Sequence, residues 1–400
     1  MGRTAIVVGG GIGGLAAAIG LRRIGWDVTV VERTRVLDDA GAGISLAANG
    51  IRALDALGAG AAVRAAARGQ YSGGTRTPRG SWLARMDGAT LERALGTPVV
   101  GIPRTTLHTL LRAELPPECL ITGARMTELD RSAPDRVRVE YVHDDERRAE
   151  AEVALVVGAD GIGSRTRALL FPDHPGPAHS GSTVLRALTR GPAAVDCDFA
   201  LTWGRGAEFG HIALADGRAE WHAVVNAPAG VRYPDPLAEL RRRFAGWHEP
   251  IPALLAATDP EAVLHHDIGE LTDPLPSFAA GRVALLGDAA HAMTPHLGQG
   301  ACQALEDAVV LAASVAEGPD VRGALARYDA ERRPRTQSVA RAARQAGRMG
   351  QQLTHPAAVA LRNTALRVAP SGTAVRMILR HAAWTPPRLP ETPREPRSID

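Results

Sequence analysis

The chain has 400 residues, enough for two or three domains with a sizeable buried core. Hydrophobic residues make up 45% and charged residues 22%, which excludes a globally disordered chain. The basic residues are all arginine, and 46 of them against 43 acidic residues leave a net charge of +3. Because no dense basic block with interleaved aromatic residues is present, the charge does not predict a nucleic-acid partner.

Cysteine spacing and hydropathy exclude further classes of protein. Cys119, Cys197 and Cys302 are far apart and match neither a metal-ligand spacing nor a redox pair, as is typical of a reducing cytoplasm. No apolar run approaches the roughly 18 residues of a membrane-spanning helix, and the N-terminus shows no signal-peptide pattern. We therefore expect a cytoplasmic protein without a membrane span or a metal site.

The first 35 residues predict a nucleotide-binding unit. Thr4–Val8 and Asp27–Val31 are apolar, β-branched runs typical of buried strands. Between them an Ala- and Leu-rich helix covers 15–24, and Gly25 ends it. The intervening turn, Gly9–Gly14, has the spacing GxGxxG, which carries weight because a strand precedes it and a helix follows it.

Each glycine of this turn has a physical role in such a unit. Gly9 lets the chain turn, Gly11 lets the backbone approach a pyrophosphate, and Gly14 lets the helix pack on the strand. The helix N-terminus then offers free N–H groups and a positive dipole end to the phosphate. Glu32, at the end of the second strand, is placed to accept hydrogen bonds from ribose hydroxyls. The alternative is a purely structural glycine-rich turn, and the flanking strands, helix and acid weigh against it.

The rest of the chain alternates between strands and helices. The sequence predicts strands at 137–141, 152–157, 182–188, 199–202, 211–214, 220–225 and 282–286, and helices at 107–115, 237–245, 301–315 and 324–349. Residues 71–98 show no clear period. The tail beyond 385 is Pro-rich, and we expect it to be loose.

Further segments resemble the motifs of one family. Gly158–Arg165 resembles the DG motif of flavoprotein monooxygenases, and Gly281–His291 resembles their GD motif. The second continues as Thr294–Ala301 and then Glu306–Ala308. The order and spacing over 1–340 are similar to those of the single-component FAD-dependent aromatic hydroxylases, the p-hydroxybenzoate hydroxylase-like class that includes salicylate, hydroxynicotinate and urate hydroxylases.

This resemblance implies an α/β fold in which a Rossmann-like FAD-binding domain is interleaved with a mixed-sheet substrate domain. We expect the FAD-binding domain over 1–70, 99–178 and 270–340, the substrate domain over 71–98 and 179–269, C-terminal helices over 341–385, and a Pro-rich tail over 386–400.

The resemblance also implies which residues bind FAD. Asp288 ends a strand where its carboxylate can accept hydrogen bonds from the ribityl hydroxyls; the alternative is a helix cap. The helix after Gly298–Gly300 would point its positive end at the flavin pyrimidine edge, beside Pro295. The full expected set is Gly9, Gly11, Ile12, Gly13, Gly14, Glu32, Arg33, Gly43, Arg104, Asp160, Asp288, Pro295, Gly298, Gln299 and Gly300.

Three members of that set have a competing interpretation. Arg104 matches the family arginine that contacts the FAD chain, but alone it would be a surface arginine. Arg33 follows Glu32 and is expected over the adenine. Asp160 matches the DG aspartate, which links flavin binding to nicotinamide use, although it can be a turn residue. The segment around Gly43 is expected to pass beside the flavin ring.

The substrate residues are less defined. Within the strands of the expected substrate domain, the pocket candidates are Arg186, Trp203, His211, Trp221 and His222, although such residues are more often core or surface residues than substrate ligands. The strand around 208–211 lacks the arginine that acts in urate hydroxylases, so urate is disfavoured. His265–Asp267 does not predict a metal site, because adjacent strand residues point to opposite faces. No single catalytic acid or base stands out.

The activity that the resemblance implies is an NADH- or NADPH-dependent, FAD-dependent monooxygenase. It would transfer one oxygen atom of dioxygen, through a flavin hydroperoxide, to an aromatic or other electron-rich small molecule. An epoxidase or tailoring oxygenase of the same fold, a flavin reductase, and a flavin-free escort protein are the alternatives. Retention of Glu32, Asp288 and Gly298–Gly300 counts against the escort protein. The sequence leaves monomer and homodimer open.

Overall fold

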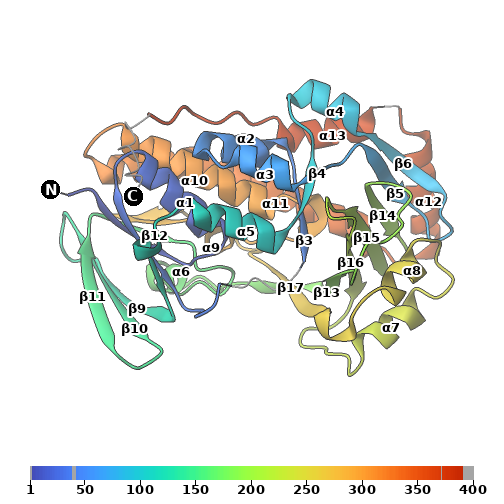
Figure 1. Ribbon diagram of the computed structural model, residues 1–400, viewed down its shortest axis with the longest axis horizontal. Coiled ribbons are helices and arrows are strands. Elements are labelled where there is room, and N and C mark those ends of the chain that lie inside the picture. Colours follow the sequence, from blue (N-terminus) through green and yellow to red (C-terminus); the bar gives the residue numbers. More distant parts are fainter. Residues whose placement is uncertain (1, 38–41, 371, 391–400) are drawn as a thin grey trace, which may run out of the picture.

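The computed structural model describes residues 2–37, 42–370 and 372–390, and within them the strands form four sheets. The two largest sheets lie side by side along the long axis of the molecule, with helices running between them (Figure 1).

The first large sheet is parallel except for one edge strand. In spatial order it contains β18 (Ala279–Ala280), β19 (Val283–Leu285), β12 (Leu155–Gly158), β1 (Thr4–Val8), β2 (Asp27–Glu32) and β8 (Leu120–Thr122), with β18 antiparallel to β19. The register aligns Val8 with both Val31 and Gly158, and Gly158 with Leu285. The glycine-rich turn, the DG motif and the GD motif therefore leave the sheet at one edge, where ligands of such sheets bind.

The strands of this sheet are apolar on both faces and share one buried core with several helices. These helices are α1 (Ile12–Arg23), α2 (Ala48–Leu57), α3 (Gly60–Ala66), α5 (Arg104–Ala113) and α10 (Gly300–Ala316). A three-stranded antiparallel sheet of β9 (Ala124–Asp130), β10 (Val137–His143) and β11 (Arg148–Val153) contributes side chains to the same core, and α6 (Arg165–Leu170) contacts β9.

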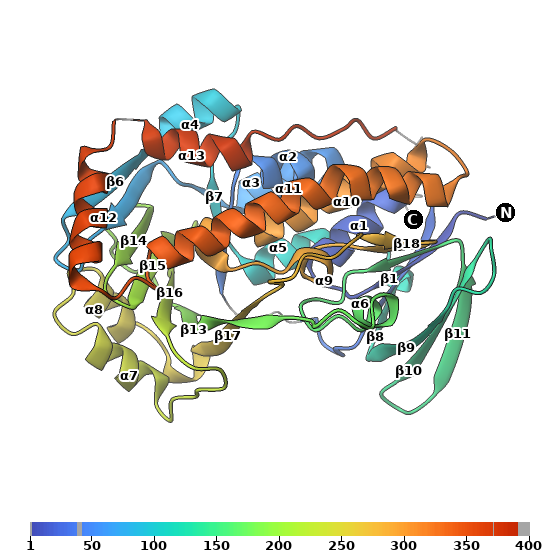
Figure 2. The ribbon, with the colours of Figure 1, turned by 180° about the vertical axis from the view of Figure 1, so that it is seen from behind.

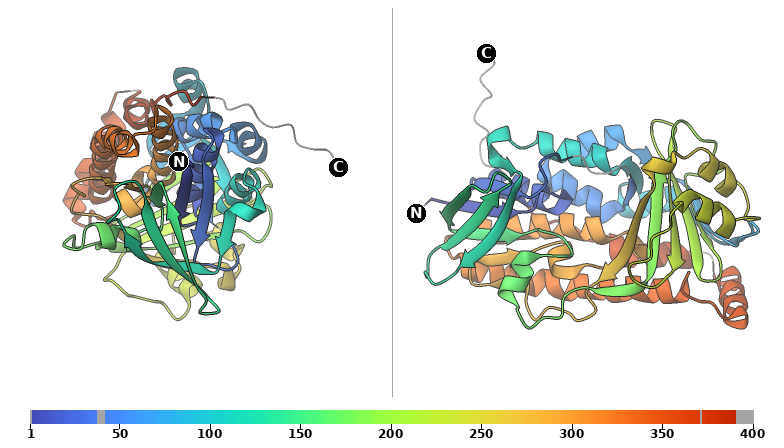
Figure 3. Two further views of the ribbon diagram at one scale, coloured as in Figure 1. Left: turned by 90° about the vertical axis from the view of Figure 1, so that its left-hand side faces the viewer. Right: turned by 90° about the horizontal axis from the view of Figure 1, so that it is seen from below.

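The second large sheet is mixed. Its order is β17 (Leu264–Glu270), β13 (Ala178–Leu188), β16 (Ala219–Asn226), β15 (Ala207–Ala213), β14 (Phe199–Trp203), β5 (Ser72–Arg76) and β6 (Trp82–Asp87), with only β14 and β5 parallel. Helices α7 (Pro236–Arg243) and α8 (Ile251–Ala256) cover its outer face and form a second core with it (Figure 3).

A small sheet of β3 (Gly43–Leu46), β7 (Val100–Pro103) and β4 (Arg68–Gly69) touches the inner face of the seven-stranded sheet. Two of its glycines make this contact possible: a Cβ on Gly43 would lie 2.6 Å from the Glu220 side chain, and one on Gly101 would lie 2.5 Å from Ile212. The inner face therefore looks toward the six-stranded sheet and its motifs.

The C-terminal part is helical, as predicted. Helix α11 (Val321–Met349) runs along the back of the molecule toward the seven-stranded sheet (Figure 2), and it is followed by α12 (Pro356–Val368) and α13 (Thr373–Ala382). Helix α13 contacts α4 (Gly88–Leu95). Short 3-10 turns cover Pro117–Cys119, Pro260–Ala262 and Pro295–Leu297.

Most predicted elements are present, with three differences. The single strand expected at 152–157 is two strands, because the N–H of Ala154 turns aside to the Thr4 carbonyl at 3.0 Å. Residues 71–98, which have no clear period, contain β5, β6 and α4. In the expected loose tail, Leu389 packs against the main core. None of the helices in the described ranges is long and apolar enough to cross a lipid bilayer.

Candidate functional site

The glycine-rich turn lies at the carboxyl edge of the six-stranded sheet. Gly9 has a φ of +108°, and a Cβ there would lie 2.4 Å from the Ala159 carbonyl oxygen. A Cβ on Gly14 would lie 1.9 Å from the Gly9 carbonyl oxygen, so α1 packs directly on the chain that leaves β1. A Cβ on Gly11 would meet nothing within 4 Å. The turn is therefore closed on its protein side and open at Gly11.

The N–H groups at the start of α1 are left for a ligand. No side chain caps it and no acidic residue lies in its first turn, so the N–H groups there have no side-chain partner. Ile12 is buried, and a Cβ on Gly13 would lie 2.9 Å from Leu286 and 3.1 Å from Ala304. The helix start therefore lies against the end of β19 and the first turns of α10.

Glu32 is fixed beside this turn. One carboxylate oxygen accepts the Gly10 N–H at 2.7 Å, and the other accepts the Thr34 N–H at 2.8 Å. Each oxygen keeps a lone pair, so the side chain can accept further hydrogen bonds. His108, which the sequence did not single out, lies with Nε2 2.7 Å from the Gly10 carbonyl oxygen. Arg33 is exposed.

Gly43 and Arg104 lie on the small sheet and at the start of α5. Gly43 pairs with Pro103, and the Arg104 N–H donates to the Ala42 carbonyl oxygen at 2.8 Å. Arg104 also interacts electrostatically with His266 of the seven-stranded sheet. Gly41, which belongs to the same family segment, lies outside the described residues.

Asp288 follows β19 as the first residue of α9 (Asp288–His291). Its side chain is exposed, and no hydrogen bond within the described ranges reaches its carboxylate. The preceding Gly287 has a φ of +58° and donates its N–H to Asp307 at 2.9 Å. The carboxylate is therefore presented at the sheet edge rather than used as a cap.

The DG motif holds a different kind of aspartate. Asp160 accepts hydrogen bonds from the Ser164 hydroxyl at 2.5 Å and from the Thr166 N–H at 2.9 Å, so it fastens the start of α6. Arg167, which the sequence did not single out, is 4% exposed and donates to the carbonyl oxygens of Ile162 and Ala289. Buried Arg167, three residues after Ser164, therefore links the backbone of the DG motif to that of the GD motif.

The segment before α10 is open and uncapped as well. Gly298 has a φ of +61°, and a Cβ on Gly298 or Gly300 would meet nothing within 4 Å. Pro295 is exposed in the preceding 3-10 turn. Gln299 is the N-cap residue of α10, but its side chain does not cap the helix. The first turn of α10 therefore offers N–H groups beside bare glycine backbone.

A buried polar network holds this segment from behind. Gln299 Oε1 accepts from Asn49 at 2.9 Å and from Gln303 at 3.0 Å, and Asn49 also donates to Glu306 at 2.7 Å. Arg332 donates hydrogen bonds to Glu306 and, at 2.7 Å, to Asp307. Asp307 is also hydrogen-bonded to His291 at 2.6 Å, and Arg335 donates to Glu306 at 2.7 Å. The backbone of the GD motif and the start of α10 are therefore set by one group of charges.

Asp307 is the most perturbed carboxyl of this network. Burial raises its pKa, but the charges of His291 and Arg332 and the hydrogen bonds from His291 and the Gly287 N–H outweigh burial and lower it to about 2. It is therefore ionised in the folded protein over the physiological range.

The inner face of the seven-stranded sheet is set by register. Across neighbouring strands Arg186 pairs with His222, His222 with Gly210, and Trp203 with Glu208, so these side chains share one face. Three of the five predicted substrate candidates, Arg186, Trp203 and His222, lie there. Glu220 lies on the same face, two residues before His222. The sequence did not single out either carboxylate, Glu208 or Glu220.

Trp221 and His211 are on the opposite face. Trp221 is fully buried, donates to the Thr258 hydroxyl at 2.7 Å and stacks on Phe209. His211 is 2% exposed, and burial lowers its pKa to about 4. The structure does not bring either residue to the inner face.

His211 belongs to a compact group that resembles a metal site. Ligand atoms of Asp196, Cys197 and His211 lie within 4.8 Å of one another. The Arg76 guanidinium, however, binds Asp196 at 2.6 Å and lies 3.8 Å from the Cys197 sulfur. A cation already occupies the carboxylate, so the group is an ion pair between buried Arg76 and exposed Asp196, beside a buried thiol and imidazole. His265 stacks on Tyr233, and Asp267 pairs with Arg232.

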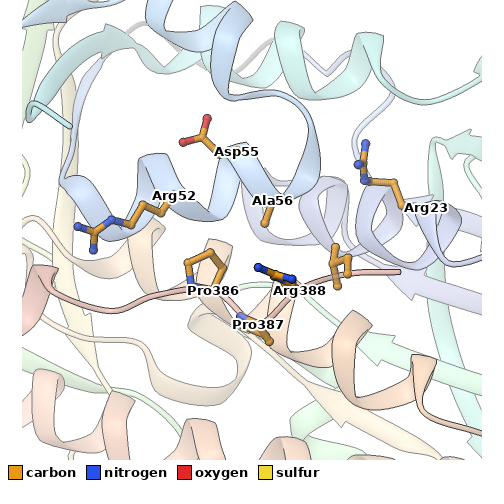
Figure 4. Close-up of a pocket in the computed structure, with 8 residues that line it drawn as sticks. Arg23, Arg52, Asp55, Ala56, Pro386, Pro387 and Arg388 are labelled. Atoms are coloured by element: carbon orange, nitrogen blue, oxygen red, sulfur yellow. The ribbon is translucent and has the colours of Figure 1, made fainter. Parts of the chain in front are cut away.

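A surface cavity of about 410 Å³ lies elsewhere, between the first two helices and the C-terminal segment (Figure 4). Its lining residues are Arg23, Arg52, Asp55, Ala56, Pro386, Pro387, Arg388 and Leu389. Arg23 ends α1, about 16 Å along the helix from the glycine-rich turn. This cavity is therefore separate from the site built by the motifs.

The residues at the motif edge fit FAD. Two uncapped helix starts provide N–H groups, bare Cα positions at Gly11, Gly298 and Gly300 leave room for a ligand, and Glu32 and Asp288 keep accepting oxygens for hydroxyl groups. A diphosphate, a ribose and a polyhydroxy chain need these three kinds of partner.

Comparison with known proteins agrees with this geometry. A family model described as the FAD binding domain matches residues 3–343. The chain is 38% identical to the aurachin C monooxygenase/isomerase of Stigmatella aurantiaca, over 88% of this chain and 90% of that protein. It is 37% identical to a 3-amino-4-hydroxybenzoate 2-monooxygenase of Streptomyces platensis, over 85% of this chain and 87% of that protein.

Among solved structures, Klebsiella pneumoniae HpxO complexed with FAD and uric acid superposes with a TM-score of 0.87 at 28% identity, covering 95% of this chain and 96% of that one. The α/β fold and the family resemblance predicted from the motifs are thereby confirmed. The chain belongs to this FAD-binding family and is an FAD-dependent monooxygenase.

Proposed function

We propose that the protein uses NADH or NADPH and dioxygen to place one oxygen atom on an electron-rich aromatic small molecule held between the FAD site and the inner face of the seven-stranded sheet. The supporting observation is the position of the segment 295–300. On one side it leads into the uncapped start of α10. On the other, His296 interacts electrostatically with Glu208 and His222 of that face.

Each part of the chain then has a task. The N–H groups of 11–14 bind the pyrophosphate, and Glu32 accepts from the ribose hydroxyls beneath the exposed Arg33. Asp288 accepts from the ribityl chain, and the start of α10 stabilises negative charge on the pyrimidine edge. When bound, FAD supplies the electron transfer and the oxygen chemistry. The two sheets orient the substrate and exclude water.

The remaining expectations belong to the same proposal. Arg104 and Gly43 lie beside the cofactor, and Asp160 acts through α6. The substrate domain covers 71–98 and 179–269, the nicotinamide binds transiently because no second GxGxxG follows, and the protein works in the cytoplasm as a monomer or homodimer. Urate is not proposed as the substrate, because the strand around Glu208 carries a carboxylate and no arginine.

A coupling assay tests the oxygenation. The FAD-loaded protein is given NADH or NADPH with a panel of phenols, anilines, aromatic acids and alkenes, and nicotinamide oxidation is compared with hydrogen peroxide release. Faster oxidation with little peroxide for an aromatic compound supports the proposal. Coupling only with alkenes would favour the epoxidase, and peroxide equal to the nicotinamide consumed with every compound would indicate a flavin reductase.

Flavin content tests the cofactor residues directly. Asp288→Ala should bind FAD about tenfold or more weakly, because a charge-assisted hydrogen bond to the cofactor is lost. Asp216→Ala, which removes an exposed turn carboxylate bonded to Arg218, is the matched control and should retain FAD. Equal FAD affinity in both variants would remove Asp288 from the site.

A further inference from the structure

Two buried carboxylates flank an imidazole on the inner face. Glu208 is 4% and Glu220 is 2% exposed, whereas the His222 side chain keeps 23% of its surface open. His222 Nδ1 lies 3.4 Å from Glu220, and Nε2 lies 4.0 Å from Glu208. A Cβ on Gly210 would lie 2.3 Å from the His222 ring, so this glycine lets the ring lie on the sheet. The imidazole is therefore held in place with one edge open.

The hydrogen-bond arrangement leaves a position for a donor. When His222 is neutral, Nδ1–H donates to Glu220, which leaves the Nε2 lone pair facing a Glu208 oxygen. Two acceptors cannot hydrogen-bond to each other, and at 4.0 Å apart both can be reached by one donor group of a ligand that lies beside them. The other Glu208 oxygen already accepts the Trp203 indole N–H at 2.5 Å. The carboxylate cannot turn to avoid the gap without breaking that bond.

We propose that Glu208, His222 and Glu220 select the substrate by an acidic O–H or N–H on its aromatic ring and accept that proton at His222 Nε2. The inference rests on the proposed oxygenation. The O–H or N–H bond breaks, its electron pair stays on the ring system, and the proton forms an N–H bond at His222, where both carboxylates stabilise the imidazolium. The ring becomes richer in electrons, which favours attack on an electrophilic oxygen.

The charges around His222 also determine which ligands bind poorly. The groups facing His222 are Glu220 on its own strand, Glu208 on β15, Arg186 on β13, and the imidazole of His296. With the imidazoles neutral, two carboxylates face one guanidinium. The immediate surroundings of His222 are therefore net negative and disfavour a ring that carries an ionised carboxylate.

The protonation of His222 supplies a pH signature. Burial lowers its pKa, but the charge and hydrogen bond of Glu220 and the charge of Glu208 outweigh burial, so the net pKa is raised. The proton acceptor is the neutral form, so affinity for a donor ligand falls as the pH falls through this pKa. Removing the Glu220 charge lowers the pKa and moves that loss of affinity to lower pH.

Three naphthalenes that differ in one group test the selection. Dissociation constants of the FAD-loaded protein for 2-naphthol, 2-methoxynaphthalene and 2-naphthoate are measured from the change in flavin absorbance on titration. 2-Naphthol should bind about tenfold or more tightly than its methyl ether, because only the hydroxyl fills the donor position. 2-Naphthoate should bind most weakly.

Variants test which residues cause the preference for 2-naphthol over its methyl ether. Glu208→Gln keeps an acceptor for Trp203 and should bring the naphthol and its ether to within about threefold, as should His222→Gln. Asp267→Asn removes a carboxylate of the same sheet that binds Arg232 and Gly230 outside this cluster, and it should keep the wild-type ratio. Glu220→Gln should shift the pH midpoint of 2-naphthol binding downward, which a merely structural carboxylate would not do.

Several results would overturn the assignment. They are equal binding of 2-naphthol and its ether, tightest binding of 2-naphthoate, an unchanged preference in both Glu208→Gln and His222→Gln, or no binding of any naphthalene to an FAD-loaded protein. FAD content and nicotinamide oxidation of the wild type are measured on the same preparation. If those are absent, the proposed oxygenation fails; if they are present and selection is absent, only this inference fails.

Discussion

The carboxyl edge of the six-stranded sheet and the inner face of the seven-stranded sheet are built on different principles. The edge is made largely of backbone: open glycines, uncapped helix starts and two carboxylates at strand ends. The inner face is made of side chains, Arg186, His222, Glu208 and Trp203, which come from separate strands and meet only through register.

This difference explains why one region is visible in the sequence and the other is not. A backbone site needs glycine at fixed spacing, and that need leaves a local motif. A side-chain site needs residues at alternate positions of paired strands, and the pairing is not written in any single segment. The buried network behind α10 is intermediate, because Glu306 and Asp307 are local but Arg332 comes from α11.

The largest expected effect concerns this network, on which the backbone site depends. Arg332→Met removes the buried cation that Glu306 and Asp307 share and leaves Arg335 as the arginine on Glu306 and His291 as the partner of Asp307, so the free energy of unfolding should fall by about 3 kcal/mol or more. Urea unfolding measures it. Arg327→Met removes an exposed arginine that pairs with Glu317, and it should cost about 1 kcal/mol or less. Similar losses in both variants would contradict the role of the network.

The same network predicts an acid-sensitive stability. The pKa of Asp307 falls from 3.8 to about 2 on folding, a shift worth about 2 kcal/mol. Because the folded-state pKa is depressed, this stability is present above pH 4 and is lost as the pH falls toward 2. The difference in unfolding free energy between wild type and Asp307→Asn should therefore shrink by about 2 kcal/mol from pH 5 to pH 2.

Acid unfolding followed by circular dichroism measures that difference. Asp216→Asn changes an exposed carboxylate outside the network and serves as the control for the loss of one negative charge. If the difference in unfolding free energy between wild type and Asp307→Asn stays constant from pH 5 to pH 2, the neighbours of Asp307 do not lower its pKa.

A pair of glycine variants separates packing from cofactor space within the turn. A Cβ on Gly14 meets the Gly9 carbonyl oxygen at 1.9 Å, so Gly14→Ala should destabilise the protein by about 2 kcal/mol even without FAD. A Cβ on Gly11 meets no protein atom, so Gly11→Ala should keep the stability of the FAD-free protein and still weaken FAD binding. Melting temperatures with and without FAD distinguish the two. An equal loss of stability without FAD would show that the turn is closed on both sides.

The motif spacings in the sequence point to residues that the structure brings to one sheet edge, and their binding of FAD stays a prediction. Gly9, Gly14 and Glu32 lie where the GxGxxG spacing predicts, because the spacing itself encodes the close approaches. Glu208 and Glu220 were not predicted, because a carboxylate on a strand gives no sign of burial until the neighbouring strands are placed. His211 and His222 were equal candidates in the sequence, yet register puts them on opposite faces.

Long-range contacts account for the other omissions. Arg167 lies just after the DG segment, but its partner in the GD motif, the Ala289 carbonyl oxygen, is more than a hundred residues away. Residues 71–98 gave no clear period because β5 begins with Ser72, Gly73 and Gly74 and is stabilised by pairing with β14. Local propensity was overridden there by the tertiary fold.

The smallest expected effect concerns Asp160, whose carboxylate either only holds the start of α6 or also contacts the cofactor. Its carboxylate accepts the Thr166 N–H and the Ser164 hydroxyl, so Asp160→Ala should cost about 1 kcal/mol of stability through loss of a helix cap. If Asp160 acts only through α6, FAD affinity should change less than about threefold, and Asp160→Asn, which keeps an acceptor, should recover most of the stability. A loss of FAD affinity as large as that of Asp288→Ala, with stability intact in Asp160→Asn, would instead place Asp160 among the groups that touch the cofactor and extend the backbone-built edge to the DG motif.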